Sequence, residues 1–251
     1  MANAKDSQGT SQGTSQGTPP KKARLVLVDD HALMRKGMKS VLYGEPDLEV
    51  VGEASDGQEA LEVCRSLKPD VVLMDVRMPQ MDGLQATQAI KRELPKISVL
   101  MVTMHENLDY LYEALKAGAA GYVLKESGQE EILGAVRGVL EGDSPLSPAL
   151  SAQLLLRLVG EKEEDTEGGR ASSPALPKEE VVEPPRDALT PRETEIMQLV
   201  VKGKTNKEIA QELVVSSLTV KTHVQHIIGK LGVSDRTQAA VRCVELGLFS
   251  S

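Results

Sequence analysis

Polar side chains capable of phosphoryl chemistry stand at the ends of four short apolar runs. Asp29 and Asp30 follow a Leu/Val run, and Asp75 follows a second one. Thr103 and Lys125 end two later runs in the same way. Since ligands of doubly wound folds bind outside the carboxyl ends of the strands, these groups should converge at one sheet edge. Carboxylate, hydroxyl and ammonium groups together indicate a divalent-metal and phosphoryl site, with Asp75 the acceptor if phosphate is bonded covalently.

The elements that must position these groups alternate between two periodicities. Short runs rich in Val, Leu and Ile predict strands, and the segments between them carry apolar residues at helical spacing. The strand candidates are 24–28, 49–53, 71–74, 98–102 and 121–124. Continuous apolar strands that alternate with helices predict an α/β fold: an open, mostly parallel, doubly wound sheet with helices on both faces.

These residues resemble a bacterial response-regulator receiver domain over residues 23–142. The resemblance rests on Val26-Leu27-Val28-Asp29-Asp30-His31, on Val72-Leu73-Met74-Asp75-Val76-Arg77-Met78-Pro79 with Met81-Asp82-Gly83, and on Thr103 and Lys125. It implies a flavodoxin-like five-stranded sheet in the order 2-1-3-4-5. It further implies that Asp75 receives a phosphoryl group from a sensor histidine kinase. The expected Mg²⁺ ligands are Asp29, Asp30, Asp75 and the backbone carbonyl of Arg77.

The chemistry of the groups agrees with these roles. A carboxylate attacks an anionic phosphoryl donor poorly unless charge is neutralised, and Mg²⁺ at Asp29 and Asp30 with the Lys125 ammonium would do so. Without the cation, at least one acid should have a raised pKa. The Thr103 hydroxyl reaches a phosphoryl oxygen only if its strand end moves inward, vacating space that Tyr122 could fill. This coupled motion predicts a two-state switch.

The segment from Leu189 to Phe249 has the pattern of a small all-α domain with four helices. Thr190-Pro191-Arg192-Glu193 is a capping box, and Gly203 ends the first helix. The second helix is expected over 207–213 with Thr205 or Asn206 as its cap. A third runs to Leu231 and a fourth from Arg236 to Leu246. Two helices joined by a turn of about four residues predict a helix-turn-helix motif, here at about 206–231.

Residues 187–251 resemble a LuxR-type output domain, so the whole chain resembles a two-component response regulator of the NarL/LuxR (FixJ) family. The words that carry this are Leu189-Thr190-Pro191-Arg192-Glu193, Asn206-Lys207-Glu208-Ile209-Ala210, Thr219-Val220-Lys221-Thr222-His223-Val224, Lys230-Leu231-Gly232-Val233 and Arg236-Thr237-Gln238-Ala239. Lys221, Thr222 and Gln225 project opposite the buried stripe, and the family pattern makes them base contacts. Thr219, Lys207, Lys230 and Arg236 lie towards helix ends, where they are expected to contact phosphates.

Charge is distributed unevenly along a chain whose net charge is −8. Nine basic and seven acidic residues between Arg186 and Ser251 make this the only folded section with a net positive charge. An anionic partner should therefore meet this end. Because the excess is small, we expect a homodimer on DNA, with the fourth helix as its contact and an inverted-repeat promoter site as its target. The alternative for the apolar residues of that helix is the core of their own domain.

The remaining segments predict a tail and a linker. Residues 1–22, with three Ser-Gln-Gly-Thr repeats, are expected to be a disordered tail. Residues 143–186 form an acidic, proline-containing linker with a short helix at 148–159. Two scattered cysteines and the lack of an apolar span or signal sequence predict a soluble cytoplasmic protein.

The functional hypothesis is a phosphorylation-controlled DNA-binding transcription regulator. Phosphorylation of Asp75 would uncover the recognition helix and promote dimeric DNA binding, with a sensor kinase and RNA polymerase as candidate protein partners. The chain would not be an enzyme beyond its own phosphorylation and dephosphorylation. The alternative is a phosphotransfer relay or sink whose C-terminal bundle binds a protein. A DNA binder that ignores phosphate would leave Thr103 and Lys125 without a task.

Overall fold

A computed structural model describes residues 21–104, 108–143, 188–246 and 248. Most of the expected tail, and all of the linker after Asp143 up to residue 186, including the helix expected at 148–159, lie outside the described residues. No described helix is both long and apolar enough to cross a membrane.

Five parallel strands form the sheet of the N-terminal domain. They are β1 (Ala23–Val28), β2 (Leu48–Ala54), β3 (Val71–Asp75), β4 (Ser98–Thr103) and β5 (Gly121–Leu124). Their spatial order is β2-β1-β3-β4-β5, as the receiver resemblance implies. Each predicted strand is present, with bounds that differ from the expected ones by at most one residue at either end. The chain order reverses between β1 and β3, which places a crevice beside the ends of those two strands.

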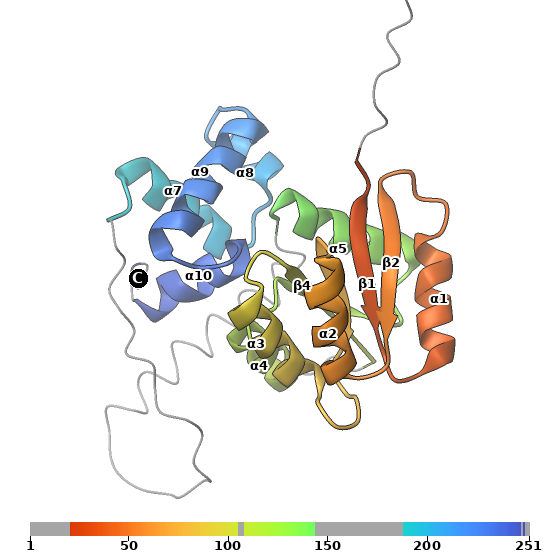
Figure 1. The fold of residues 1–251 in the computed structure, drawn as a ribbon. Coiled ribbons are helices and arrows are strands. Elements are labelled where there is room, and N and C mark those ends of the chain that lie inside the picture. Colours follow the sequence, from red (N-terminus) through yellow and green to blue (C-terminus); the bar gives the residue numbers. More distant parts are fainter. Residues whose placement is uncertain (1–20, 105–107, 144–187, 247, 249–251) are drawn as a thin grey trace, which may run out of the picture.

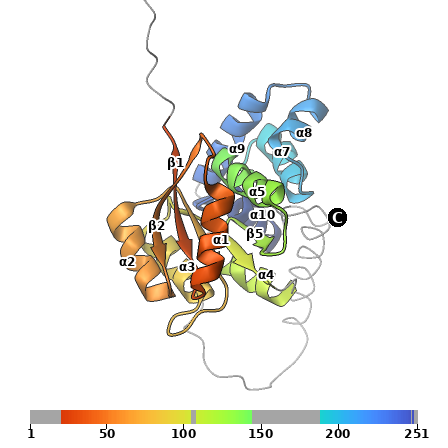
Figure 2. The same cartoon turned by 90° about the vertical axis from the view of Figure 1, so that its right-hand side faces the viewer.

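Five helices cover the two faces of this sheet. They are α1 (Ala32–Leu42), α2 (Gly57–Leu67), α3 (Gly83–Glu93), α4 (Leu108–Lys116) and α5 (Gln129–Glu141). Figure 1 and Figure 2 show α1 and α5 on one face, with α2, α3 and α4 on the other. The sheet is therefore the middle of three layers.

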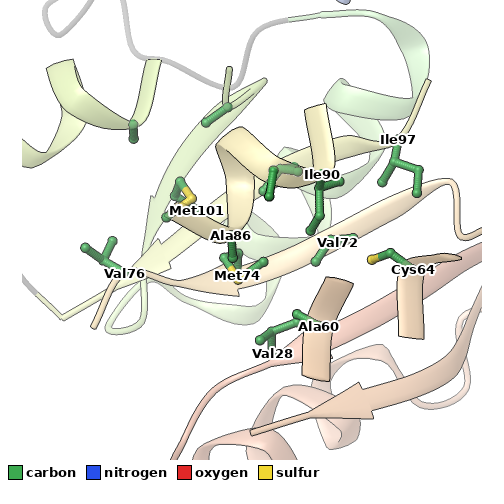
Figure 3. Packing of buried hydrophobic residues seen from close by; sticks show 14 of the residues in the cluster. Val28, Ala60, Cys64, Val72, Met74, Val76, Ala86, Ile90, Ile97 and Met101 are labelled. Carbon is green, nitrogen blue, oxygen red and sulfur yellow. The ribbon is translucent and has the colours of Figure 1, made fainter. Parts of the chain in front are cut away.

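The alternation of side chains along the strands divides the core in two. Val28, Met74 and Met101 face α2 and α3, where they pack with Ala60 and Ala86 (Figure 3). Their neighbours in sequence point to the other face and pack against α1 and α5; these are Leu27, Leu73, Leu100 and Val102. Because both faces are buried, the strands read as continuous apolar runs rather than alternating ones.

The C-terminal domain packs four described helices around its own core. They are α7 (Pro191–Val201), α8 (Asn206–Glu212), α9 (Ser217–Leu231) and α10 (Arg236–Glu245). Each begins after a residue whose side chain accepts a hydrogen bond from a backbone N–H in the first turn: Thr190, Thr205, Ser216 and Asp235. The capping box predicted at Thr190 and Glu193 is confirmed, and Thr205 is the cap of α8.

The two domains contact each other through α10. The Thr237 hydroxyl donates to the carbonyl of Ala120 at 2.7 Å, and the Gln238 amide donates to the carbonyl of Leu115 at 2.8 Å. Val241 packs against the apolar cluster on the α4 side of the sheet. Figure 1 shows α10 beside α3 and α4. The N-terminal half of α10 is thus docked on the turn that joins α4 to β5.

Candidate functional site

The predicted acids, hydroxyl and ammonium groups meet at the carboxyl edge of the sheet. Asp29 directly follows β1, while Asp75 and Thr103 are the last residues of β3 and β4. Lys125 follows β5, and its backbone N–H donates to the carbonyl of Thr103 at 2.7 Å. Parallel register makes the four strand ends neighbours, so chain positions almost a hundred residues apart form one site.

Lys125 bridges two of the acids. Its Nζ lies 2.6 Å from Oδ2 of Asp29 and 2.8 Å from Oδ2 of Asp75. All three side chains are at least nine-tenths buried. Buried charges persist only when they are paired, so the ammonium is what permits two carboxylates to lie this close.

Burial and neighbouring charges shift two pKa values in this cluster, those of Asp75 and Lys125. Burial raises the pKa of the Asp75 carboxyl, and the nearby Asp29 charge adds to the rise, while the hydrogen bond from Lys125 opposes it. Burial alone would lower the pKa of the Lys125 ammonium, but the two carboxylates outweigh it and raise that pKa. The rise expected for at least one acid pKa is thus found at Asp75, where burial contributes more to it than the charge of Asp29 does.

The donors around the acids suit a hard divalent cation. One ligand atom each from Asp29, Asp30 and His31 lie within 4.8 Å of one another. His31 Nδ1 is 2.7 Å from Oδ1 of Asp30, and the backbone N–H of His31 donates to Oδ1 of Asp29 at 2.8 Å. Carboxylate oxygens are the ligands that Mg²⁺ prefers, so the donor set fits the acidic Mg²⁺ site of receiver domains.

Two arginines support the site in ways that the sequence patterns missed. Arg35 of α1 donates to the backbone carbonyl of Asp29 at 2.5 Å. Arg77, two residues after Asp75, donates to the Tyr110 hydroxyl of α4 at 2.5 Å, and its guanidinium lies 5.1 Å from the centre of that ring. The Arg77 contact therefore ties the loop that follows Asp75 to α4. For Arg35, the only signal of its contact in the sequence was its position one helical turn after His31.

The two predicted switch residues are both buried. Thr103 ends β4 with 5% of its surface exposed, and Tyr122 lies in β5 with 6% exposed. Tyr122 belongs to the apolar cluster on the α4 side of the sheet, together with Leu111 and Leu115 of α4. Thr103 and Tyr122 lie on neighbouring strands, because β4 pairs with β5.

In the C-terminal domain, one face of α9 is buried and the opposite face carries the predicted base-contacting residues. Val220, Val224, Ile227 and Leu231 lie in the core. Thr222 and Gln225 are exposed and Lys221 is half-buried. Lys221 and Gln225 line a cleft of about 320 Å³ whose other wall is the C-terminal end of α5, with Val139, Leu140 and Glu141. Two residues of the predicted DNA-reading face, Lys221 and Gln225, therefore lie opposite the receiver, whereas Thr222 does not line this cleft.

The predicted phosphate-contacting residues lie in contrasting environments. Thr219 and Lys207 are exposed, whereas Lys230 pairs with Glu193 at 2.7 Å. Arg236 is 3% exposed; its guanidinium donates to Asn206 Oδ1 at 2.6 Å and pairs with Asp143 Oδ1 at 3.1 Å. Asp143 belongs to the receiver side of the chain. The Arg236 guanidinium, which the resemblance assigns to a DNA phosphate, is therefore already paired with this carboxylate.

Comparisons with known proteins match both halves of the chain. Residues 25–137 match the response regulator receiver domain, and residues 187–243 match the bacterial regulatory proteins of the luxR family. The transcriptional regulatory protein LiaR of Bacillus subtilis is 43% identical, over 87% of this chain and 95% of its own length. The response regulator protein VraR of Staphylococcus aureus is 39% identical, over 90% of this chain and 98% of its own.

A solved structure agrees with these relatives. A LuxR-family two-component response regulator from Aurantimonas sp. SI85-9A1 is 34% identical, with a TM-score of 0.50, over 59% of this chain and all of its own. Both named relatives are matched over nearly their full length, so the similarity extends over both domains of this chain. The chain belongs to the NarL/LuxR-type response regulators, which are phosphorylation-controlled transcription regulators of two-component systems rather than classical enzymes.

Proposed function

We propose that Asp75 is the phosphoryl acceptor and that its phosphorylation uncovers the DNA-reading face of α9. The observation that carries the chemical part is the Lys125 ammonium within 2.8 Å of both Asp29 and Asp75 at the sheet edge. A sensor histidine kinase supplies the phosphoryl group, and later hydrolysis at Asp75 returns the resting state. Self-phosphorylation and dephosphorylation are the only reactions assigned to the chain.

Charge neutralisation governs the attack by Asp75. Asp29, Asp30, Asp75 and the backbone carbonyl of Arg77 would hold Mg²⁺, which supplies positive charge at the phosphoryl oxygens when bound. Lys125 leaves Asp29 and turns to the phosphoryl group from the opposite side, so the acceptor carboxylate no longer meets an uncompensated anion. The Thr103 hydroxyl donates to a phosphoryl oxygen once β4 has moved inward.

The change at Thr103 reaches the output domain along a short physical route. Tyr122 and Leu115 of α4 belong to the same buried apolar cluster, and the Leu115 carbonyl accepts the hydrogen bond from Gln238 of α10. Displacement of α4 or of the turn before β5 would therefore weaken the contact between α10 and the receiver. The contact between α10 and the receiver would thus have two states, docked and open, and the phosphoryl group would favour the open one.

Release of α10 would serve DNA binding in two ways. The C-terminal end of α5 forms the other wall of the cleft beside Lys221 and Gln225, so the docked receiver would stand where a DNA duplex must approach these two side chains. Opening would clear this approach. Opening would also free Val241 and the rest of α10 for contact with a second copy, giving the homodimer that an inverted-repeat promoter site requires. RNA polymerase would be a partner of the bound dimer.

The test combines phosphorylation with DNA selection on the full-length protein. Wild type, Asp75→Asn and the exposed control Glu49→Gln would be treated with Mg²⁺ and a small-molecule phosphodonor and assayed for acyl phosphate. The same proteins, with or without beryllofluoride, would be mixed with fragmented genomic DNA. We expect acyl phosphate and beryllofluoride-dependent fragment enrichment in wild type and Glu49→Gln only.

Each result has a distinct meaning. Phosphorylation that persists in Asp75→Asn would remove Asp75 as the acceptor. Normal phosphorylation with no enrichment would support the phosphotransfer relay instead. Equal enrichment with and without beryllofluoride would contradict masking.

A further inference from the structure

The first turn of α9 carries a large apolar side chain that the domain core does not use. Leu218 is 73% exposed, whereas the other aliphatic residues of α9 are buried or packed against the core cluster. Leu218 does not line the cleft between α9 and α5, so it stays exposed while the domains are docked. Most of its surface is therefore covered neither by the domain core nor by the receiver.

Leu218 lies on the same helical stripe as the predicted base-contacting residues. Residues three, four and seven positions apart share one face of an α-helix, and Lys221, Thr222 and Gln225 follow Leu218 at those spacings. The Thr222 hydroxyl donates to the Leu218 carbonyl at 3.0 Å, which fixes the turn between them. N-terminal residues of a recognition helix are the ones that contact base edges, and Leu218 is the second residue of α9.

The chemistry of the major groove decides what an aliphatic side chain reads there. The base edges present hydrogen-bond donors and acceptors, and the thymine C5-methyl is the apolar feature. We propose that Leu218 is a specificity-determining residue that contacts a thymine methyl group in each half-site of the operator. The proposal deepens the proposed function and rests on its assignment of α9 as the reading helix. Lys221 and Gln225 would then supply polar readout and Leu218 the apolar one.

The test removes the methyl group and the side chain separately. Beryllofluoride-activated full-length protein would select duplexes from a random-sequence pool, and each thymine of the selected site would be replaced in turn by deoxyuridine, which lacks the methyl. For wild type we expect one position per half-site at which affinity falls about 4-fold, the effect of one buried methyl-sized group. Leu218→Ala should bind the thymine duplex correspondingly less tightly and be indifferent to deoxyuridine at that position.

Matched variants separate this proposal from the function on which it rests. Leu33→Ala removes a leucine of similar exposure, 79%, from α1 and should keep the full deoxyuridine effect. Lys221→Ala should weaken binding to every duplex and still keep that effect. An unaltered affinity in Lys221→Ala would count against the proposed reading face itself.

Three results would overturn the role of Leu218. They are a wild-type protein indifferent to every deoxyuridine substitution, a Leu218→Ala variant with the full wild-type sensitivity, and a Leu218→Ala variant with unchanged DNA affinity that loses transcription in a purified system. The last would assign the side chain to a protein partner. Thermal unfolding of Leu218→Ala should match wild type, since an exposed side chain adds little to the core.

Discussion

Val214 is held in a left-handed backbone conformation at the C-terminal end of α8. Its φ is 53° and its side chain is 90% exposed. The backbone N–H of Val215 donates to the Ala210 carbonyl at 3.0 Å, the bond of a Schellman motif, in which glycine usually takes the left-handed position. A β-branched residue is strained there and gains no packing in return.

Replacing Val214 by glycine should therefore stabilise the protein. We expect Val214→Gly to raise the free energy of unfolding of the C-terminal domain by about 1 kcal/mol, most of the left-handed penalty. Urea denaturation followed by circular dichroism measures this. Val215→Gly, at a half-buried neighbour that packs on the core, should instead lower stability. A loss of stability in Val214→Gly would mean that the valine makes a contact worth more than its strain.

Glu193 is a buried carboxylate whose partners keep it ionised. Burial by itself would raise its pKa, but hydrogen bonds from Lys230 and from Thr190 lower that pKa from 4.5 to about 2. The unfolded chain thus takes up a proton at a higher pH than the folded one does. The stabilisation is complete above about pH 4.5 and is lost as the pH falls towards 2.

Glu193→Gln should remove that pH-dependent stabilisation. At pH 7 we expect it to lower the free energy of unfolding by about 2 kcal/mol, the value of a charge-assisted hydrogen bond. The difference from wild type should shrink in urea titrations between pH 4.5 and pH 3. Glu195→Gln, in a half-exposed pair with Arg192, should show little effect at any pH. A Glu193→Gln deficit that does not change with pH would assign the loss to packing.

At the scale of elements, the close approach of α3 to β3 depends on Gly83. A Cβ there would lie 1.9 Å from the backbone carbonyl oxygen of Asp75, a contact that only backbone movement can relieve. Gly83→Ala should therefore cost about 3 kcal/mol of stability and slow phosphorylation, because the acceptor residue itself is displaced.

A glycine in open surroundings is the matched control. Gly134 of α5 has no atom within 4 Å of where its Cβ would lie. Gly134→Ala should raise stability by up to about 1 kcal/mol through helix propensity and leave phosphorylation unchanged. Thermal unfolding and a phosphodonor assay check both variants. Equal phosphorylation rates in Gly83→Ala and wild type would show that the α3 start does not position Asp75.

The elements were predictable to the extent that their signals are local. Strand 121–124 was expected and observed with the same bounds, because an unbroken apolar run between turns leaves few alternatives. The strand ends then brought Asp29, Asp75, Thr103 and Lys125 together, as parallel topology requires. The link from Arg77 to Tyr110 was not predictable, because long side chains that cross between elements leave no periodic trace.

At the scale of the whole molecule, the docking of α10 was beyond sequence reasoning. The fourth helix was expected to contact a second copy on DNA, with the core of its own domain as the alternative for its apolar residues. In the structure Ala239, Ala240 and Cys243 do pack in that core. Polar side chains of α10 donate to receiver backbone carbonyls, at Leu115, Ala119 and Ala120. Every residue has a backbone carbonyl, so no sequence pattern indicates which carbonyls accept these hydrogen bonds. The same helix cannot face the receiver and a second copy through Val241 at once, which makes docking and dimerisation competing states.

This competition predicts that weakening the dock should imitate phosphorylation. Gln238→Ala removes the hydrogen bonds to Leu115 and Ala119, and a combined loss of about 1 kcal/mol shifts the balance between docked and open molecules about 5-fold. Small-angle scattering of the unphosphorylated variant should show a larger radius of gyration. The variant should also enrich the operator fragments several-fold without beryllofluoride, while the exposed Gln211→Ala of α8 should match wild type.

The radius of gyration and the DNA binding of Gln238→Ala test separate parts of this prediction. A larger radius of gyration with wild-type DNA binding would show that the domains part without exposing a reading surface, and masking would then be wrong. An unchanged radius would mean that the Lys91–Asp235 pair and the Asp143–Arg236 pair, at 3.4 Å and 3.1 Å, hold the dock by themselves. Asp143→Asn distinguishes these pairs, because it loosens the dock and also frees Arg236 for phosphate. Its gain in DNA affinity should therefore exceed that of Gln238→Ala and be the more sensitive to salt.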